Sequence, residues 1–125
     1  MNINWESYGV DIDDAGFWDR YAEAQKCVAT DPINETDPGE EIRAYCAAFR
    51  QFFCVLIGEE AANEVLKDVC DNKKKMDDVY ASLLQCVHAQ RVASSNRMAK
   101  ILAQYAPKRR GQVLEKSNGT DTSSV

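Results

Sequence analysis

The stretch EEIRAYCAAFRQFFCVLIG, Glu40–Gly58, is far more apolar than the chain around it. Between Ile42 and Ile57 the only charged side chains are Arg43 and Arg50. A helix that crosses a bilayer needs about 20 mostly apolar residues, whereas this run has sixteen, two of them arginine. The stretch therefore predicts a core or contact helix at the centre of the protein, and it argues against a membrane anchor.

This predicted helix has a bulky face and a face of small residues. At 100° per residue, its large apolar side chains cover roughly 140° of the helical wheel. The opposite face allows a close approach of another helix, either the first or last helix of the same domain or a helix of a partner. The bulky face holds Ile42, Tyr45, Cys46, Phe49, Phe52, Phe53, Leu56 and Ile57, and the small face holds Ala44, Ala47, Ala48, Gln51 and Val55.

The flanking segments predict a small, mainly α domain of about four helices with a short N-terminal β-hairpin. The loose alternation of apolar residues over 1–12 favours the hairpin. A first helix is expected over about 14–29, with an aspartate cap at its start. The central helix begins with a cap at Asp37, a shorter helix begins at Glu59, and a last helix runs over about 76–105.

Length and charge predict one domain followed by a flexible tail. The chain has 125 residues, of which 45% are hydrophobic and 28% charged, as is typical of a soluble globular protein. We expect a single helical domain over residues 1–106 and a flexible, basic and polar tail over 107–125. Residues 1–41 hold eleven acidic and two basic residues, and residues 91–125 hold two acidic and seven basic ones. Such asymmetry is typical of chains that use their ends for contacts.

No group of residues predicts catalysis, a metal site or a cofactor site. His88 is the only histidine, and as an acid, base or ligand it would need placed partners that the sequence does not offer, so we interpret it as a surface or boundary residue. The cysteine count is odd and no CxxC spacing occurs, which favours reduced thiols in a cytoplasmic compartment. The protein is therefore predicted not to be an enzyme. Its cysteines are Cys27, Cys46, Cys54, Cys70 and Cys86.

Five segments together resemble a known family. In chain order they are MNINWESYGVDID, WDRYAEA, IRAYCAAFRQFF, IGEEAANEVL and ASLLQCVHAQ. Their order and spacing over roughly residues 1–105 resemble the small tail assembly chaperones encoded by long-tailed phages and prophages.

This resemblance implies a non-enzymatic protein that works without a cofactor. Members of that family bind the tape-measure protein, keep it soluble and recruit tail-tube subunits during tail assembly. The resemblance also implies a location in the cytoplasm of the infected bacterial host and absence from the mature virion. Many copies along one long partner would gain from avidity and from contacts with each other, so self-association is also expected.

Contact residues are expected on three parts of the chain. They are the aromatic Trp18 on the first helix, the small-face residues Ala44, Ala48 and Val55, and the basic residues Arg97, Lys108, Arg109 and Arg110.

A different class of function stays open beside the chaperone. A small helical regulator or adaptor would contact nucleic acid or transcription machinery through residues 91–110. The net charge of −5 argues against a nucleic-acid partner. An enzyme of unrecognised type is the third hypothesis.

Overall fold

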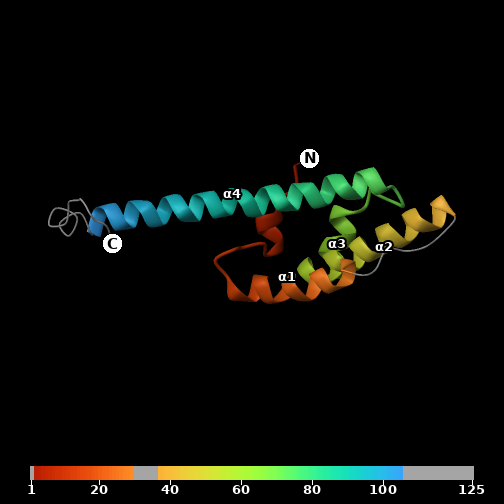
Figure 1. Cartoon of the computed structure of the whole chain (residues 1–125), viewed down its shortest axis with the longest axis horizontal. Coiled ribbons are helices and arrows are strands. Elements are labelled where there is room, and N and C mark those ends of the chain that lie inside the picture. The colour runs from red at the N-terminus through yellow and green to blue at the C-terminus, as the bar shows by residue number, and fades with distance from the viewer. Residues whose placement is uncertain (1, 30–36, 106–125) are drawn as a thin grey trace, which may run out of the picture. The chain divides into compact units, whose positions relative to one another are not determined.

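The computed structural model describes residues 2–29 and 37–105. These residues are mainly helical, as predicted. Figure 1 shows a 3₁₀ helix, η1 (Trp5–Tyr8), and the α-helices α1 (Ala15–Val28), α2 (Pro38–Ile57), α3 (Glu59–Val65) and α4 (Lys73–Tyr105).

The chain divides into two compact units, which we call unit 1 (Met1–Gln90) and unit 2 (Arg91–Val125). The helix α4 contributes its residues up to Gln90 to unit 1 and its residues from Arg91 onward to unit 2.

The predicted β-hairpin is wrong. Residues 2–12 form η1 flanked by turns and irregular backbone, and no strand occurs in the described ranges 2–29 and 37–105. Apolar residues are two positions apart from Ile3 to Trp5 but three apart from Trp5 to Tyr8. A spacing of three fits one turn of 3₁₀ helix. Gly9 ends this turn at φ 91°, a backbone conformation that favours glycine, and its N–H donates to the carbonyl of Glu6.

Aspartate caps begin α1 and α2, as predicted. The Asp14 carboxylate accepts a hydrogen bond from the Gly16 N–H at 3.2 Å. The Asp37 carboxylate accepts one from the Gly39 N–H at 2.9 Å, with Pro38 in the first turn. Each cap pairs a backbone donor that the helix itself leaves unpaired.

The helix α4 begins at Lys73, three residues before the predicted start near Met76. The side chain of Asn72 accepts a hydrogen bond from the Lys75 N–H at 2.9 Å. An asparagine at this position is a favourable helix cap, so the lysine run forms the first turn of the helix.

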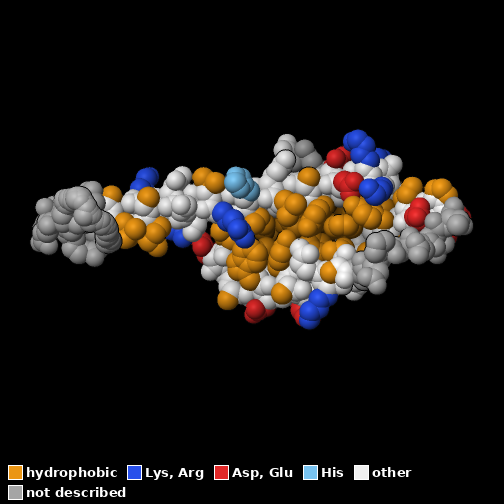
Figure 2. All heavy atoms as spheres, in the orientation of Figure 1, with side chains coloured by type: hydrophobic (Ala, Val, Ile, Leu, Met, Phe, Trp, Pro, Cys, Tyr) orange, Lys and Arg blue, Asp and Glu red, His pale blue; other side chains and the backbone are white. Residues whose placement is uncertain are grey.

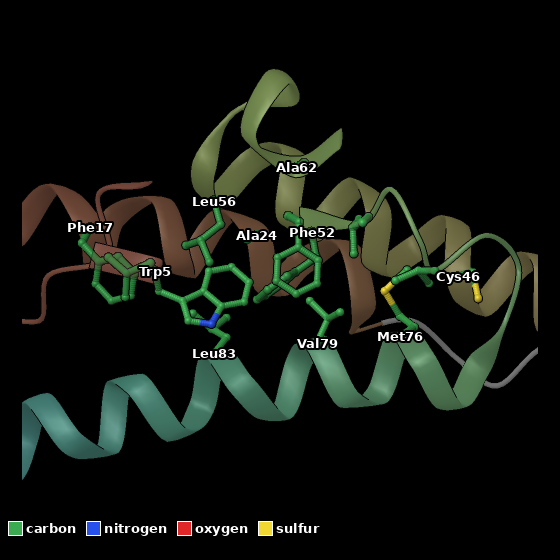
Figure 3. Close-up of a cluster of buried hydrophobic side chains, with 14 residues drawn as sticks. Trp5, Phe17, Ala24, Cys46, Phe52, Leu56, Ala62, Met76, Val79 and Leu83 are labelled. Carbon is green, nitrogen blue, oxygen red and sulfur yellow. The ribbon is translucent and has the colours of Figure 1, made fainter. Parts of the chain in front are cut away.

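Trp5 lies at the centre of the core of unit 1. Its indole ring stacks on Phe53 with centroids 5.7 Å apart, and its Nε1 donates to the Ser82 hydroxyl at 2.9 Å. Figure 3 shows the buried side chains between α4 and the other helices. Because Trp5 contacts both α2 and α4, η1 joins these helices. The core consists of Trp5, Val10, Phe17, Ala24, Cys46, Phe52, Phe53, Leu56, Ala62, Leu66, Val69, Met76, Val79 and Leu83.

A second link joins the N-terminal segment to α4 within unit 1. The side-chain amide of Gln90 donates to the carbonyl of Val10 at 2.9 Å, and its oxygen accepts from the N–H of Ile12 at 2.9 Å. One side chain thus pairs two backbone groups that would otherwise need water.

Candidate binding surfaces

The described part of unit 2, residues 91–105, exposes one apolar side of α4. Met98, Ile101, Leu102 and Tyr105 are 51, 40, 53 and 77% exposed. Their spacing places them within roughly 100° of the helix circumference, and we call them the apolar stripe. Figure 2 shows hydrophobic side chains along this part of the helix. Single exposed apolar residues are ordinary, but four on one side of a helix indicate a contact surface.

The surroundings of the apolar stripe are positively charged. Residues 91–105 contain Arg91, Arg97 and Lys100 and no acidic residue. By helical geometry Arg91 lies in line with the stripe, Arg97 lies beside it, and Lys100 lies on the opposite side. The side chain of Arg97 is exposed, with Nη2 3.4 Å from the hydroxyl of Ser94.

Only Arg97 among these residues is a contact residue predicted from the sequence. The stripe itself was missed, although the spacing of one apolar face is present in the segment MAKILAQY, residues 98–105. The polar run ASSN at 93–96 separates it from the apolar residues before it, which obscures the pattern. Lys108, Arg109 and Arg110 lie outside the described residues.

Trp18 is half-buried on α1 and takes part in the fold. Its Nε1 donates to the carbonyl of Ile12 at 2.8 Å. Its ring meets those of Phe17 and Tyr21 edge-on, with centroids 5.0 and 5.5 Å away. These contacts leave part of the indole accessible to a partner.

The small face of α2 is partly accessible in unit 1. Ala44, Ala48 and Val55 are half-buried, and Ala47 and Gln51 are exposed. This face therefore retains room for another helix to approach, although Val55 also packs against the core.

A series of aromatic rings crosses unit 1 from α1 to α4. Phe52 lies between Tyr21 and Tyr80, with centroid distances of 6.1 and 5.6 Å, and Phe49 lies between Tyr80 and Tyr45, at 4.9 and 5.0 Å. Phe52 is buried, but the other four rings are only partly buried. Figure 2 shows hydrophobic side chains gathered on the visible face of unit 1. The rings hold the helices together, and the four partly buried ones form a second candidate surface.

The hydroxyl of Tyr45 donates a hydrogen bond to the carboxylate of Asp77. The Nζ of Lys73 lies 4.7 Å from the centroid of the Tyr45 ring and 3.7 Å from Asp77 Oδ2. Burial, followed by the hydrogen bond to Asp77, raises the pKa of Tyr45 to about 12. The phenol of Tyr45 therefore keeps its proton near pH 7. Its hydrogen bond to Asp77 links α2 to α4.

The thiols and the histidine offer little chemistry. Burial raises the pKa of Cys46, Cys54 and Cys86, which keeps them as thiols, the weakly nucleophilic form. His88 is exposed on α4. Within residues 2–29 and 37–105, no group of three or more His, Cys, Asp or Glu side chains could hold a metal ion.

A groove of about 520 Å³ also lies in unit 1, between the N-terminal segment, α3 with the turn after it, and the first turns of α4. Its lining includes both acidic and basic side chains. Two of them, Glu64 and Lys67, form an ion pair with Nζ 3.2 Å from Oε2. The groove thus has no dominant charge to select a ligand. Its lining comprises Asn2, Ile3, Asn4, Tyr8, Glu64, Val65, Lys67, Asp68, Val69, Lys75 and Val79.

The helices in the described part of the chain are too short or too polar to cross a membrane. The model of DUF6673, a family of unknown function, matches residues 4–118, so the chain belongs to that family. No curated protein and no solved structure matches the chain.

Proposed function

For this member of the DUF6673 family, we propose the function of a tail assembly chaperone of a long-tailed phage or prophage. It binds the tape-measure protein, keeps it soluble and recruits tail-tube subunits. The observation that carries the proposal is the apolar stripe Met98, Ile101, Leu102 and Tyr105 on the accessible helix of unit 2. The resemblance over residues 1–105 supplies the identity of the partner.

The helical structure of a tape-measure protein suits binding to the apolar stripe. A tape-measure protein is a very long helical chain whose apolar stripes would aggregate before the tail assembles. Helices commonly bind one another by pairing apolar faces whose side chains recur every three and four residues. The stripe offers that spacing, and covering it would shield the partner's apolar side chains from water.

The size of the stripe suits reversible binding by many copies. Fully burying one Met, Leu or Ile side chain stabilises by about 1.5–3 kcal/mol, and the stripe residues are already partly covered. Burying the rest of the four side chains would therefore contribute about a few kcal/mol to binding. Much of this is offset by the translational and rotational freedom that the two partners lose on association. One contact is therefore weak. Many copies along one long partner gain through avidity and still dissociate when tube subunits replace them.

Other predicted contacts have secondary roles in this proposal. Trp18 and the small face with Ala44, Ala48 and Val55 would meet neighbouring copies or tail-tube subunits. Arg97 lies beside the stripe and would meet the tape-measure protein. The protein acts without catalysis or a cofactor, in the cytoplasm of the infected host, and leaves before the virion is complete.

Co-expression tests the proposal. The protein is produced with the tape-measure protein encoded nearby, and the complex is captured in moderate salt through a tag on this chain. We expect the tape-measure protein to become soluble and to co-purify with many copies. A tape-measure protein that stays insoluble while this chain purifies alone would overturn the proposal.

A second candidate function rests on the charge of unit 2. Three cations and no acid within residues 91–105 favour a regulator or adaptor that contacts nucleic acid or transcription machinery. Retention on duplex DNA that weakens steeply as salt rises would support this function. Passage through a DNA column at low salt would exclude a nucleic-acid target.

A further inference from the structure

We propose that residues 95–105 of α4, which we call the distal segment, form a helix that opens and closes while unit 1 stays folded. Opening here means loss of the helical hydrogen bonds of the distal segment alone. Burial, local sequence and the hydrogen bonds of α4 determine this behaviour, which is independent of the partner that the protein binds.

The distal segment has no buried side chain. All of its residues are exposed, and its large apolar side chains range from Ile101 at 40% to Tyr105 at 77%. The first turns of α4 instead bury Met76, Val79 and Leu83. Because most of the stability of a protein helix comes from packing of its apolar side, the distal segment depends mainly on local interactions for its helical structure.

These local interactions are weak. Ser95 and Asn96 favour a helix less than alanine does, since their side chains compete for backbone hydrogen bonds. Residues 91–105 contain no acidic residue, so no pair of opposite charges four residues apart supports the helix within them. The last turn has no basic side chain to offset the partial negative charge of a helix C-terminus.

The distal segment is helical because unit 1 supplies the turns before it. Forming the first turn of a helix is the costly step, whereas each further residue adds one hydrogen bond at a free-energy change near zero. Ala99 and Leu102 are good helix formers and favour the closed form. The closed and open forms are therefore close in free energy, and the distal segment opens often.

The opening stops before it reaches unit 1. Gln90 donates to the carbonyl of Val10 and accepts from the N–H of Ile12, both at 2.9 Å, which holds α4 at that residue. Ser94 is half-buried, unlike residues 95–105. The boundary between the stable part of α4 and the opening part therefore lies within residues 91–94.

Opening couples helix formation to binding. A partner that binds only the helical form shifts the distal segment toward the helix, and its apparent affinity falls with the fraction of molecules that are open. Substitutions that strengthen the helix therefore tighten such binding without contacting the partner.

Amide hydrogen exchange of the full-length chain, followed by NMR, measures the opening residue by residue. We expect the amides of Met98, Ile101 and Leu102 to exchange about 3- to 100-fold more slowly than those of an unstructured peptide. The amides of Val79 and Leu83 should exchange at least about 100-fold more slowly again, because they are released only when unit 1 unfolds.

Leu83→Ala tests whether the two parts of α4 open separately. It removes a buried side chain and should speed exchange of core amides such as that of Val79 at least about tenfold. The amides of the distal segment should stay within about twofold of the wild type, because their opening does not involve unit 1.

A second pair of variants tests the helix of the distal segment itself. Ser95→Ala/Asn96→Ala should slow exchange of the distal amides at least about threefold, because alanine favours the helix more. Val92→Ser is the matched control, since Val92 is 47% exposed, precedes the distal segment and lies roughly 130° from the centre of the apolar stripe. Valine and serine have similar helix propensities, so this change should alter distal exchange less than about twofold.

Four results would overturn the inference. Distal amides as well protected as those of Val79 and Leu83 would show that α4 opens as one unit. A loss of protection in Leu83→Ala that is equal in both parts of α4 would lead to the same conclusion. Distal amides without protection would show that the segment is not helical, and unchanged distal exchange in Ser95→Ala/Asn96→Ala would exclude a local opening of the helix. All of these measurements omit the tape-measure protein, so this inference and the proposed function can each fail alone.

Discussion

The two parts of α4 differ in the surroundings of their apolar side chains. In unit 1, Met76, Val79 and Leu83 are at most 1% exposed and pack in the core. In unit 2, Ile101 and Leu102 are 40 and 53% exposed. The same secondary structure and similar side chains thus lead to different energetics, because, among the residues that the structure describes, only the first part packs against other helices of its unit.

This contrast separates stability from binding. Substitutions in the first part of α4 should lower the free energy of unfolding, since they remove buried contacts. Substitutions in the stripe should leave that free energy nearly unchanged and should alter only what the protein binds. Four predictions test the contrast, from the largest effect to the smallest.

Replacing Trp5 by alanine should have the largest effect on unit 1. Trp5→Ala removes the ring stacked on Phe53 and leaves the Ser82 hydroxyl without its indole donor. We expect the free energy of unfolding to fall by about 3–5 kcal/mol, measured by urea denaturation followed by circular dichroism. A loss below about 1 kcal/mol would show that η1 does not join α2 to α4 as described.

Two leucines of α4 offer a matched pair. Leu83→Ala should lower the free energy of unfolding by about 2–5 kcal/mol, because Leu83 is fully buried. Leu102→Ala, at an exposed position, should change it by no more than about 0.5 kcal/mol. The same urea titration serves both variants. Equal losses would contradict the distinction between the two parts of the helix.

Gln90→Ala should have an intermediate effect. It leaves the N–H of Ile12 and the carbonyl of Val10 without their protein partner, which costs about 1–3 kcal/mol. Faster hydrogen exchange of the Ile12 amide should accompany the loss. Gln85→Ala, at an exposed position of α4, is the control and should change stability little. An unchanged exchange rate in Gln90→Ala would refute the proposed link.

Alkaline pH should weaken unit 1 through Tyr45. Its pKa is raised from 10.0 to about 12 in the folded chain, so the unfolded chain loses this proton first. The contribution is fully present below pH 10 and is lost as pH rises from about 10 to about 12. Stability should fall more steeply over this window in the wild type than in Tyr45→Phe. Tyr105→Phe is the control and should retain the wild-type slope, because position 105 is 77% exposed. Identical slopes in all three proteins would contradict the role of Tyr45 in the loss of stability at alkaline pH.

Local chemistry explains which features were predicted from the sequence. The caps Asp14 and Asp37 bond to N–H groups two residues ahead, so each is encoded within a few positions. The bulky face of α2 follows from its period, and Cys46, Phe52, Phe53 and Leu56 are indeed buried. The caps and the period of this face depend only on neighbouring residues, whereas the burial of the face comes from η1, α1 and α4.

Features that depend on distant residues were not predicted. The η1 turn places Trp5 against Ser82, 77 residues along the chain, and no local alternation of apolar residues reveals that contact. The stripe in unit 2 has a readable period, but its exposure depends on which helices lie nearby. Sequence spacing alone cannot distinguish a buried stripe from an accessible one.

The central claim is that the stripe of unit 2 binds a partner and does not stabilise the fold. Its most direct test is capture of the tape-measure protein by the wild type, Val92→Ser and Ile101→Ser/Leu102→Ser at equal expression, with the urea midpoint of each variant measured in parallel. We predict that the wild type and Val92→Ser retain the tape-measure protein, and that the double variant loses most of it at an unchanged midpoint. Full capture by the double variant would contradict the claim.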